Sequence, residues 1–126
     1  MNKIKVLVVE DQAVVREGVV AILSFSPDIE VVGQAENGAQ ALAMVKTKKP
    51  DVILLDLVMP QMDGLTAIPR IKEINPDAKV LLASGYSING QASKIMERGC
   101  DGFIQKPFTL KQLSTKIREI LDGGKN

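Results

Sequence analysis

The chain has 126 residues, of which 45% are hydrophobic and 25% are charged, a size and balance typical of one globular domain with a real core. The formal net charge is +1, which favours neither nucleic acid nor an anionic membrane as a partner. No apolar run is long enough to span a bilayer, and the N-terminus lacks the features of a signal peptide. Together with the lone Cys100, which excludes an internal disulfide, these features predict a cytoplasmic protein.

Apolar runs of strand length alternate with segments of helical period along the whole chain. Thr109 is a candidate N-cap of the last helix, and Pro69 should kink or shorten the third. The predicted elements in chain order are strand 4–10, helix 13–23, strand 28–36, helix 37–49, strand 51–56, helix 63–74, strand 78–84, helix 88–98, strand 101–105 and helix 109–121.

This alternation predicts the fold class. Five strand–helix units favour a parallel sheet with helices on both faces. Five units are too few for an eight-fold barrel, so we expect an α/β, doubly wound sheet. We see no linker or repeat, and we expect residues 1–126 to form a single domain.

Polar residues stand where the predicted strands end. Asp56 interrupts the apolar run of the third strand, and Glu10 and Asp11 follow the first; Ser84 ends the fourth, and Lys106 follows the fifth. Ligands of doubly wound sheets bind at the carboxyl ends of the strands. We therefore expect these five side chains to meet at one rim. Each one alone has an ordinary structural interpretation, such as a turn residue or a solvated charge.

Carboxylates crowded at a partly buried rim repel one another, and a dication relieves that repulsion. Mg²⁺ prefers oxygen ligands and leaves room for a phosphate. The chain has no histidine, so zinc or another soft site is not expected. A carboxylate such as Asp56, beside Mg²⁺ and a lysine, can attack phosphorus and form an aspartyl phosphate.

Four motifs resemble one known family in the expected order. They are "VVEDQ" at 8–12, "ILLDLVMPQMDG" at 53–64, "LLASG" at 81–85 and "GFIQKPF" at 102–108. They are similar to the receiver domain of two-component response regulators, the CheY-like superfamily. The resemblance covers nearly the whole chain and implies a flavodoxin-like sheet of strand order 2-1-3-4-5.

The resemblance also implies roles for individual residues. Asp11 would hold Mg²⁺ directly, and Glu10 largely through water. Asp56 would be the phospho-acceptor, the backbone carbonyl of Val58 would complete the metal shell, and Lys106 would contact the phosphoryl oxygens.

Three further features follow from the same resemblance. Ser84 would be the switch hydroxyl that moves onto the phosphate. Phe103 would be the switch aromatic that then turns inward. The peptide bond between Lys106 and Pro107 would be cis, a minority state that packing must hold.

The function we expect is a phosphorylation-dependent switch. A sensor histidine kinase, a phosphotransfer protein or a small phosphodonor would phosphorylate Asp56, and an unknown downstream protein would bind the changed surface of residues 88–98, 101–105 and 109–121. We expect self-catalysed phosphoryl transfer and dephosphorylation but no metabolic enzyme activity. The protein would be a monomer or a phosphorylation-dependent dimer, without direct nucleic-acid binding.

Several alternatives stay open. The short tail "LDGGKN" favours a stand-alone receiver, but "VVGQAENGAQAL" resembles receivers of DNA-binding regulators, whereas the second half resembles receivers of sensor kinases. A receiver excised from such a larger protein is therefore the second hypothesis. A Mg²⁺-dependent phosphatase would need a second aspartate where Val58 stands. A flavin carrier would need Gly, Ser or Thr donors where "VVEDQ" stands.

Overall fold

Parallel strands and covering helices make up the computed structural model, which describes residues 3–56, 64–84, 100–106 and 108–122. The described strands are β1 (Ile4–Val9), β2 (Ile29–Ala35), β3 (Val52–Asp56), β4 (Lys79–Ser84) and β5 (Gly102–Gln105). The described helices are α1 (Ala13–Ser24), α2 (Gly38–Lys48), α3 (Gly64–Ile74) and α5 (Leu110–Leu121).

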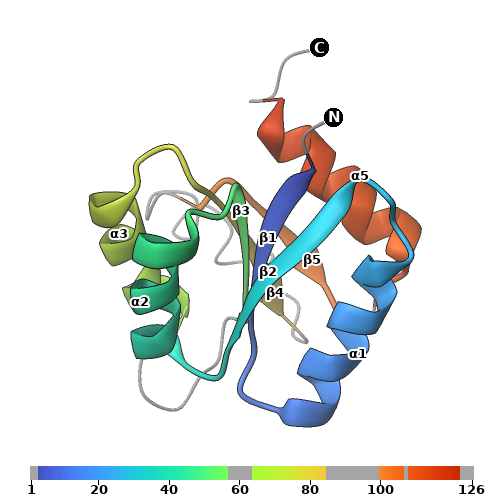
Figure 1. Ribbon diagram of the computed structural model, residues 1–126, viewed down its shortest axis with the longest axis horizontal. Helices are drawn as coiled ribbons and strands as arrows, with labels where there is room; N and C mark the ends of the chain where they lie inside the picture. Colours follow the sequence, from blue (N-terminus) through green and yellow to red (C-terminus); the bar gives the residue numbers. More distant parts are fainter. Residues whose placement is uncertain (1–2, 57–63, 85–99, 107, 123–126) are drawn as a thin grey trace.

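The strands form one parallel sheet in the order β2-β1-β3-β4-β5. α2 and α3 cover one face of this sheet, while α1 and α5 cover the other (Figure 1). The prediction of a doubly wound α/β sheet, with the strand order implied by the family resemblance, is confirmed.

Alternate residues of the central strands supply two separate core layers. In β1, Leu7 and Val9 pack with α2 and α3, whereas Val6 and Val8 pack with α1 and α5. All four are essentially excluded from solvent. A parallel strand that is buried on both faces has no place for a polar side chain except at its ends.

The predicted element bounds agree with the described ones to within one residue at each end. The predicted helix 88–98 lies outside the described residues. The prediction that Pro69 shortens its helix is wrong, because α3 continues through Pro69 to Ile74. The proline ring lies on the exposed side of α3, where α3 keeps its buried face through Ile68 and Ile71.

The helix starts differ in how they are capped. Thr109 is the N-cap of α5, as predicted: its hydroxyl accepts a hydrogen bond from the Gln112 N–H, and the Gln112 side chain accepts one from the Thr109 N–H. This reciprocal pair is a capping box. Asn37 caps α2 with its side-chain oxygen. The N-cap of α1, Gln12, makes no side-chain cap hydrogen bond.

An ion pair at the amino ends of the strands ties β2 to α5. The Arg118 guanidinium donates to both carboxylate oxygens of Asp28, at 2.6–3.1 Å, and the Ser26 hydroxyl donates to Asp28 at 2.7 Å. The hydrogen bonds from Arg118 lower the pKa of Asp28 most, and the one from Ser26 adds to this effect. Together they bring the pKa from 3.8 to about 2. No helix in the described part of the chain combines the length and apolar character needed to cross a membrane.

The lowered pKa of Asp28 makes the ion pair a pH-dependent contribution to stability. Because the folded carboxyl titrates below the unfolded one, its stabilisation is present above about pH 4 and is lost as pH falls through about 2. We expect Asp28→Asn to lower the urea midpoint at pH 7, and we expect this difference from the wild type to shrink as pH falls below 4. A difference that stays constant over this range would contradict the assignment.

Candidate functional site

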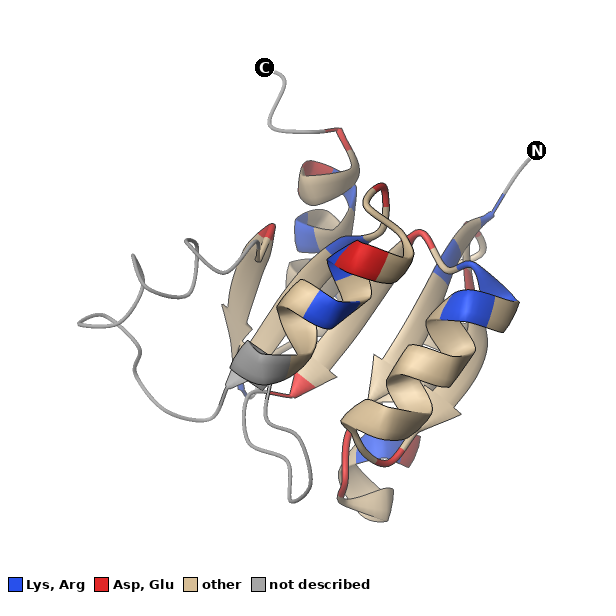
Figure 2. Ribbon diagram, turned by 90° about the vertical axis from the view of Figure 1, so that its left-hand side faces the viewer, with Lys and Arg blue, Asp and Glu red and all other residues tan. Residues whose placement is uncertain are grey.

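The register of the sheet brings the ends of β1 and β3 together. Val9 pairs with Leu55, so that Glu10 and Asp56 are neighbours one position further along. Both continue the alternation of the residues that face α1 and α5, namely Val6 and Val8 in β1 and Leu54 in β3. The two carboxylates therefore emerge from the core side by side. Figure 2 shows charged ribbon segments at the end of the sheet where the arrowheads lie.

Lys106 reaches the same point from the far edge strand. It follows Gln105, the last residue of β5, and it continues the alternation of Ile104, which faces α5. Its Nζ donates to Glu10 Oε1 at 2.6 Å and to Asp56 Oδ1 at 3.4 Å. One ammonium thus serves two carboxylates, and its own side chain is 25% exposed.

Glu10 is held at every polar atom. Its N–H donates to the Ala35 carbonyl, and its own carbonyl accepts from Arg16 Nη1 at 2.8 Å. Of its carboxylate oxygens, one accepts from Lys106 and the other from the Gln12 N–H at 3.3 Å. Glu10 is only 5% exposed, so its orientation is fixed by the protein and not by water.

The pKa values of Glu10 and Lys106 are both raised. Burial is the main cause for Glu10, helped by the charge of Asp56 and opposed by the hydrogen bonds from Lys106 and Gln12. For Lys106, burial is the largest single influence and would lower the pKa. The hydrogen bond to Glu10 and the charges of Asp56 and Glu10 together outweigh it. At neutral pH Lys106 is therefore protonated and within reach of both Glu10 and Asp56.

Glu10, Asp11 and Asp56 form a group of carboxylates suited to a cation. Each offers an oxygen, and these oxygens lie within 4.8 Å of one another. Glu10 is buried, whereas Asp11 is more open to solvent, so that ligands of a bound ion could include water. Carboxylate oxygens and water are the ligands that Mg²⁺ takes, and the set contains no sulfur or imidazole for a softer metal. The residues fit the predicted Mg²⁺ site.

The other predicted site residues are placed less fully. Ser84 ends β4, and it pairs with Gln105 one position beyond the pairing of Asp56 with Ala83. Its backbone therefore lies at the same rim. Val58 and Pro107 lie outside the described residues, so the predicted carbonyl ligand and the predicted cis peptide stay predictions.

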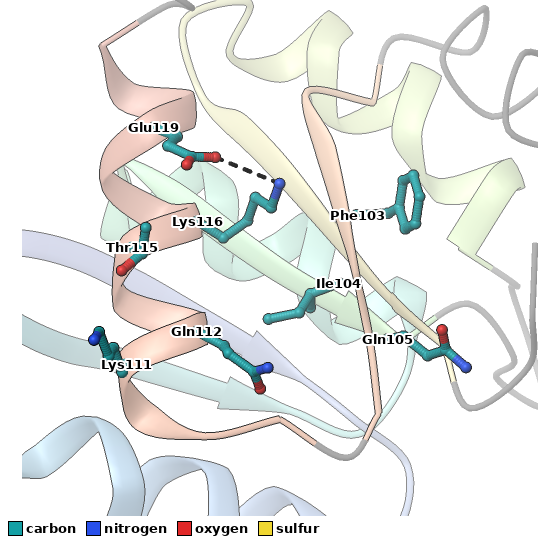
Figure 3. A pocket seen from close by; sticks show the side chains of 8 residues that line it. All are labelled: Phe103, Ile104, Gln105, Lys111, Gln112, Thr115, Lys116 and Glu119. Carbon is teal, nitrogen blue, oxygen red and sulfur yellow. Dashed lines mark ion pairs between the residues drawn. The ribbon is translucent and has the colours of Figure 1, made fainter.

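Phe103 lies on β5 and is one of the residues that line a surface pocket of about 470 Å³. In Figure 3 its ring points to the opposite side of β5 from Ile104 and the α5 side chains, and Phe103 is 36% exposed. Lys116, paired with Glu119 at 3.4 Å, lies on the α5 side. The pocket is lined by Phe103, Ile104, Gln105, Lys111, Gln112, Thr115, Lys116 and Glu119.

Comparison with known proteins identifies the family to which this chain belongs. Residues 6–118 match the family model of the response regulator receiver domain. The chain belongs to this family. It is a receiver, the signalling switch of a response regulator, and not simply a protein of similar topology.

Relatives of this receiver support the same assignment. The response regulator protein VraR of Staphylococcus aureus (strain NCTC 8325 / PS 47) is 38% identical over 120 residues, which make up 95% of this chain and 57% of VraR. The receiver thus spans a little over half the length of that relative.

Two solved structures share the fold of the receiver closely. The signal receiver domain of NarL from Mycobacterium tuberculosis is 34% identical, with a TM-score of 0.91, covering 98% of this chain and 99% of that one. The response regulator domain of Thermotoga maritima CheB is 31% identical, with a TM-score of 0.88, covering 96% and 98%.

Two residues of the rim were not among the predicted site residues. Arg16 and the backbone N–H of Gln12 both bind Glu10. The sequence pattern places Arg16 only on a helix, and no motif distinguishes it from a solvated arginine. A backbone donor leaves no signal in side-chain identity at all.

The Lys106–Glu10 pair predicts a pH-dependent loss of stability. In the metal-free protein, Lys106→Met removes a hydrogen bond that lowers the pKa of Glu10, so that pKa rises further above 4.5. When the pKa of Glu10 is higher in the folded state than in the unfolded state, the folded protein loses stability as pH rises through that range. We expect a loss of about 1–3 kcal/mol in unfolding free energy at pH 7, and a smaller loss at pH 5.

Urea unfolding in the presence of a chelator measures this effect. Lys111→Met, at an exposed position of α5, is the matched control and should change stability little at either pH. An equal loss for Lys106→Met at both pH values would show that the ion pair does not control Glu10.

Proposed function

We propose that this receiver accepts a phosphoryl group on Asp56 and thereby switches a protein-binding surface. The observation that carries the proposal is the position of Asp56. Its carboxylate emerges from the end of the central strand β3 with 12% of the side chain exposed, 3.4 Å from the Lys106 ammonium and within the carboxylate group of Glu10 and Asp11.

In the proposed reaction, one carboxylate oxygen of Asp56 attacks the phosphorus of a phosphodonor. The bond from phosphorus to the donor breaks, and the electron pair leaves with the donor group. Glu10, Asp11 and Asp56 would hold Mg²⁺, with the Val58 carbonyl, and the ion would neutralise the negative charge that accumulates on the phosphoryl oxygens. Lys106, 3.4 Å from Asp56, would supply a second positive charge.

The switch would follow from the charge of the product. Phosphorylation adds about −1.5 to −2 charges, next to an ammonium that is now shared between Glu10 and Asp56. Lys106 and the Ser84 hydroxyl would move towards the new oxygens, and Phe103 would turn inward from its half-exposed position. The β5–α5 surface with its pocket (Figure 3) would change shape, which a downstream protein could bind.

A sensor histidine kinase or a phosphotransfer protein is the proposed donor, because the chain contains no histidine of its own. We propose that residues 1–126 form a single receiver domain. The alternative, a receiver that belongs to a longer regulator, is supported by VraR, of which the matching segment makes up 57%.

Phosphate incorporation tests the proposed acceptor. With Mg²⁺ and acetyl phosphate, the wild type should incorporate a radiolabelled phosphoryl group that is stable in acid and released by base. Asp56→Asn should abolish incorporation, because an amide cannot serve as the nucleophile. Asp51→Asn, at the opposite end of the same strand, should retain it. Equal labelling of Asp56→Asn and the wild type would refute the assignment.

Thermal unfolding tests the proposed metal site. An ion that binds only the folded state stabilises it by about 2.7 kcal/mol at a concentration 100 times the dissociation constant. We therefore expect Mg²⁺ to raise the melting temperature of the wild type and of Asp51→Asn. Asp11→Asn should remove most of this increase, and an unchanged increase would place the ion elsewhere.

A further inference from the structure

The start of α1 is fixed in an unusual way. A side-chain hydrogen bond caps the start of α2 and of α5, but the Gln12 side chain makes no such bond at the start of α1. The Gln12 N–H instead donates to the Glu10 carboxylate. The segment that carries Asp11 therefore depends on other contacts for its geometry.

Arg16 supplies one of these contacts. It lies in the fourth position of α1, and its N–H begins the helix by donating to the Gln12 carbonyl at 2.9 Å. Helical side chains lean towards the N-terminus of their helix, so the half-buried Arg16 reaches back over the first turn. Its Nη1 donates to the Glu10 carbonyl at 2.8 Å.

The Glu10 carbonyl belongs to the same planar peptide unit as the Asp11 N–H. A hydrogen bond to that carbonyl therefore sets the plane from which the Asp11 side chain projects. The remaining hydrogen bonds of Glu10 lie outside this peptide unit: the Glu10 N–H donates to the Ala35 carbonyl, and the Glu10 carboxylate accepts from Gln12 and Lys106. Arg16 is the contact that comes from α1.

We propose that Arg16 is a positioning residue of the phosphorylation site: it holds the Glu10–Asp11 peptide so that the two carboxylates present a preformed cation site. This inference rests on the proposed function, because it assigns Arg16 a role in the Mg²⁺ binding proposed there. Arg16 acts through the backbone and need not touch the metal or the phosphoryl group.

A simple electrostatic role for Arg16 would have the opposite effect. If its guanidinium acted only as a positive charge near three carboxylates, removing that charge would strengthen the binding of a dication. If Arg16 positions the peptide, removing it weakens binding. Contacts that orient metal ligands from outside typically contribute 10- to 100-fold in affinity. The sign and the size of the change in Mg²⁺ affinity therefore both distinguish the positioning role from the electrostatic one.

Calorimetric titration with Mg²⁺ tests the proposal on the intact chain. Arg16→Gln should weaken Mg²⁺ binding by about 10-fold or more. Arg16→Lys, which keeps the charge and one donor, should recover part of that loss. The matched control is Arg118→Gln, which removes a guanidinium bound to Asp28 at the opposite end of the sheet; it should lower stability without changing Mg²⁺ affinity.

Two further measurements separate positioning from general destabilisation. In metal-free protein, Arg16→Gln should shift the amide nitrogen resonance of Asp11, whereas Arg118→Gln should not. With acetyl phosphate, the rate of phosphorylation of Arg16→Gln should approach that of the wild type once Mg²⁺ is saturating, because the loss lies in the affinity for the ion.

The outcomes are distinct. If the wild type binds Mg²⁺ and Arg16→Gln binds it equally or more tightly, the positioning role is overturned while the proposed function stands. Equal weakening by Arg118→Gln would also overturn it, because the effect would then be one of stability. If the wild type itself does not bind Mg²⁺, the metal role in the proposed function fails, and this inference fails with it. If Arg16→Gln does not fold, Arg16→Lys decides by the same comparison.

Discussion

The hydrogen-bonded ion pair between Lys106 and Glu10 joins two strands that are not neighbours in the sheet. β3 and β4 lie between β1 and β5, and the ammonium crosses this distance above their carboxyl ends to within 2.6 Å of the glutamate. Asp56, at the end of β3, lies under this bridge at 3.4 Å. The Lys106 ammonium offsets part of the repulsion between the Glu10 and Asp56 carboxylates. A change of charge on Asp56 would therefore act on residues at the carboxyl ends of both β1 and β5.

Burial on both faces explains why so much was predictable from the sequence. Because β1 and β3 have no solvent-exposed face, their residues are continuous apolar runs, and a carboxylate in such a run can only be at its end. This pattern identifies Asp56 as the end of its strand, and the parallel arrangement implies that Glu10 and Lys106 lie at the same rim. The bounds of the elements and the cap at Thr109 follow equally from local patterns.

What the sequence left undetermined depends on tertiary contacts. Arg16 looks like any helical arginine until the turn before it brings the Glu10 carbonyl within reach. The N–H of Gln12 has no side-chain signal. The expected shortening of α3 at Pro69 does not occur: local preference counts against proline inside a helix, but the packing of Ile68 and Ile71 on either side of it keeps α3 continuous.

The capping box of α5 has a mechanical consequence. Thr109, the N-cap of α5, stands only three residues after Lys106, and its reciprocal hydrogen bonds with Gln112 stabilise the first turn against unwinding. A pull on Lys106 towards a new charge at Asp56 would therefore not be absorbed by fraying of the helix end. A displacement of Lys106 would instead move α5 as a rigid body, up to its last turn, where Arg118 forms the ion pair with Asp28.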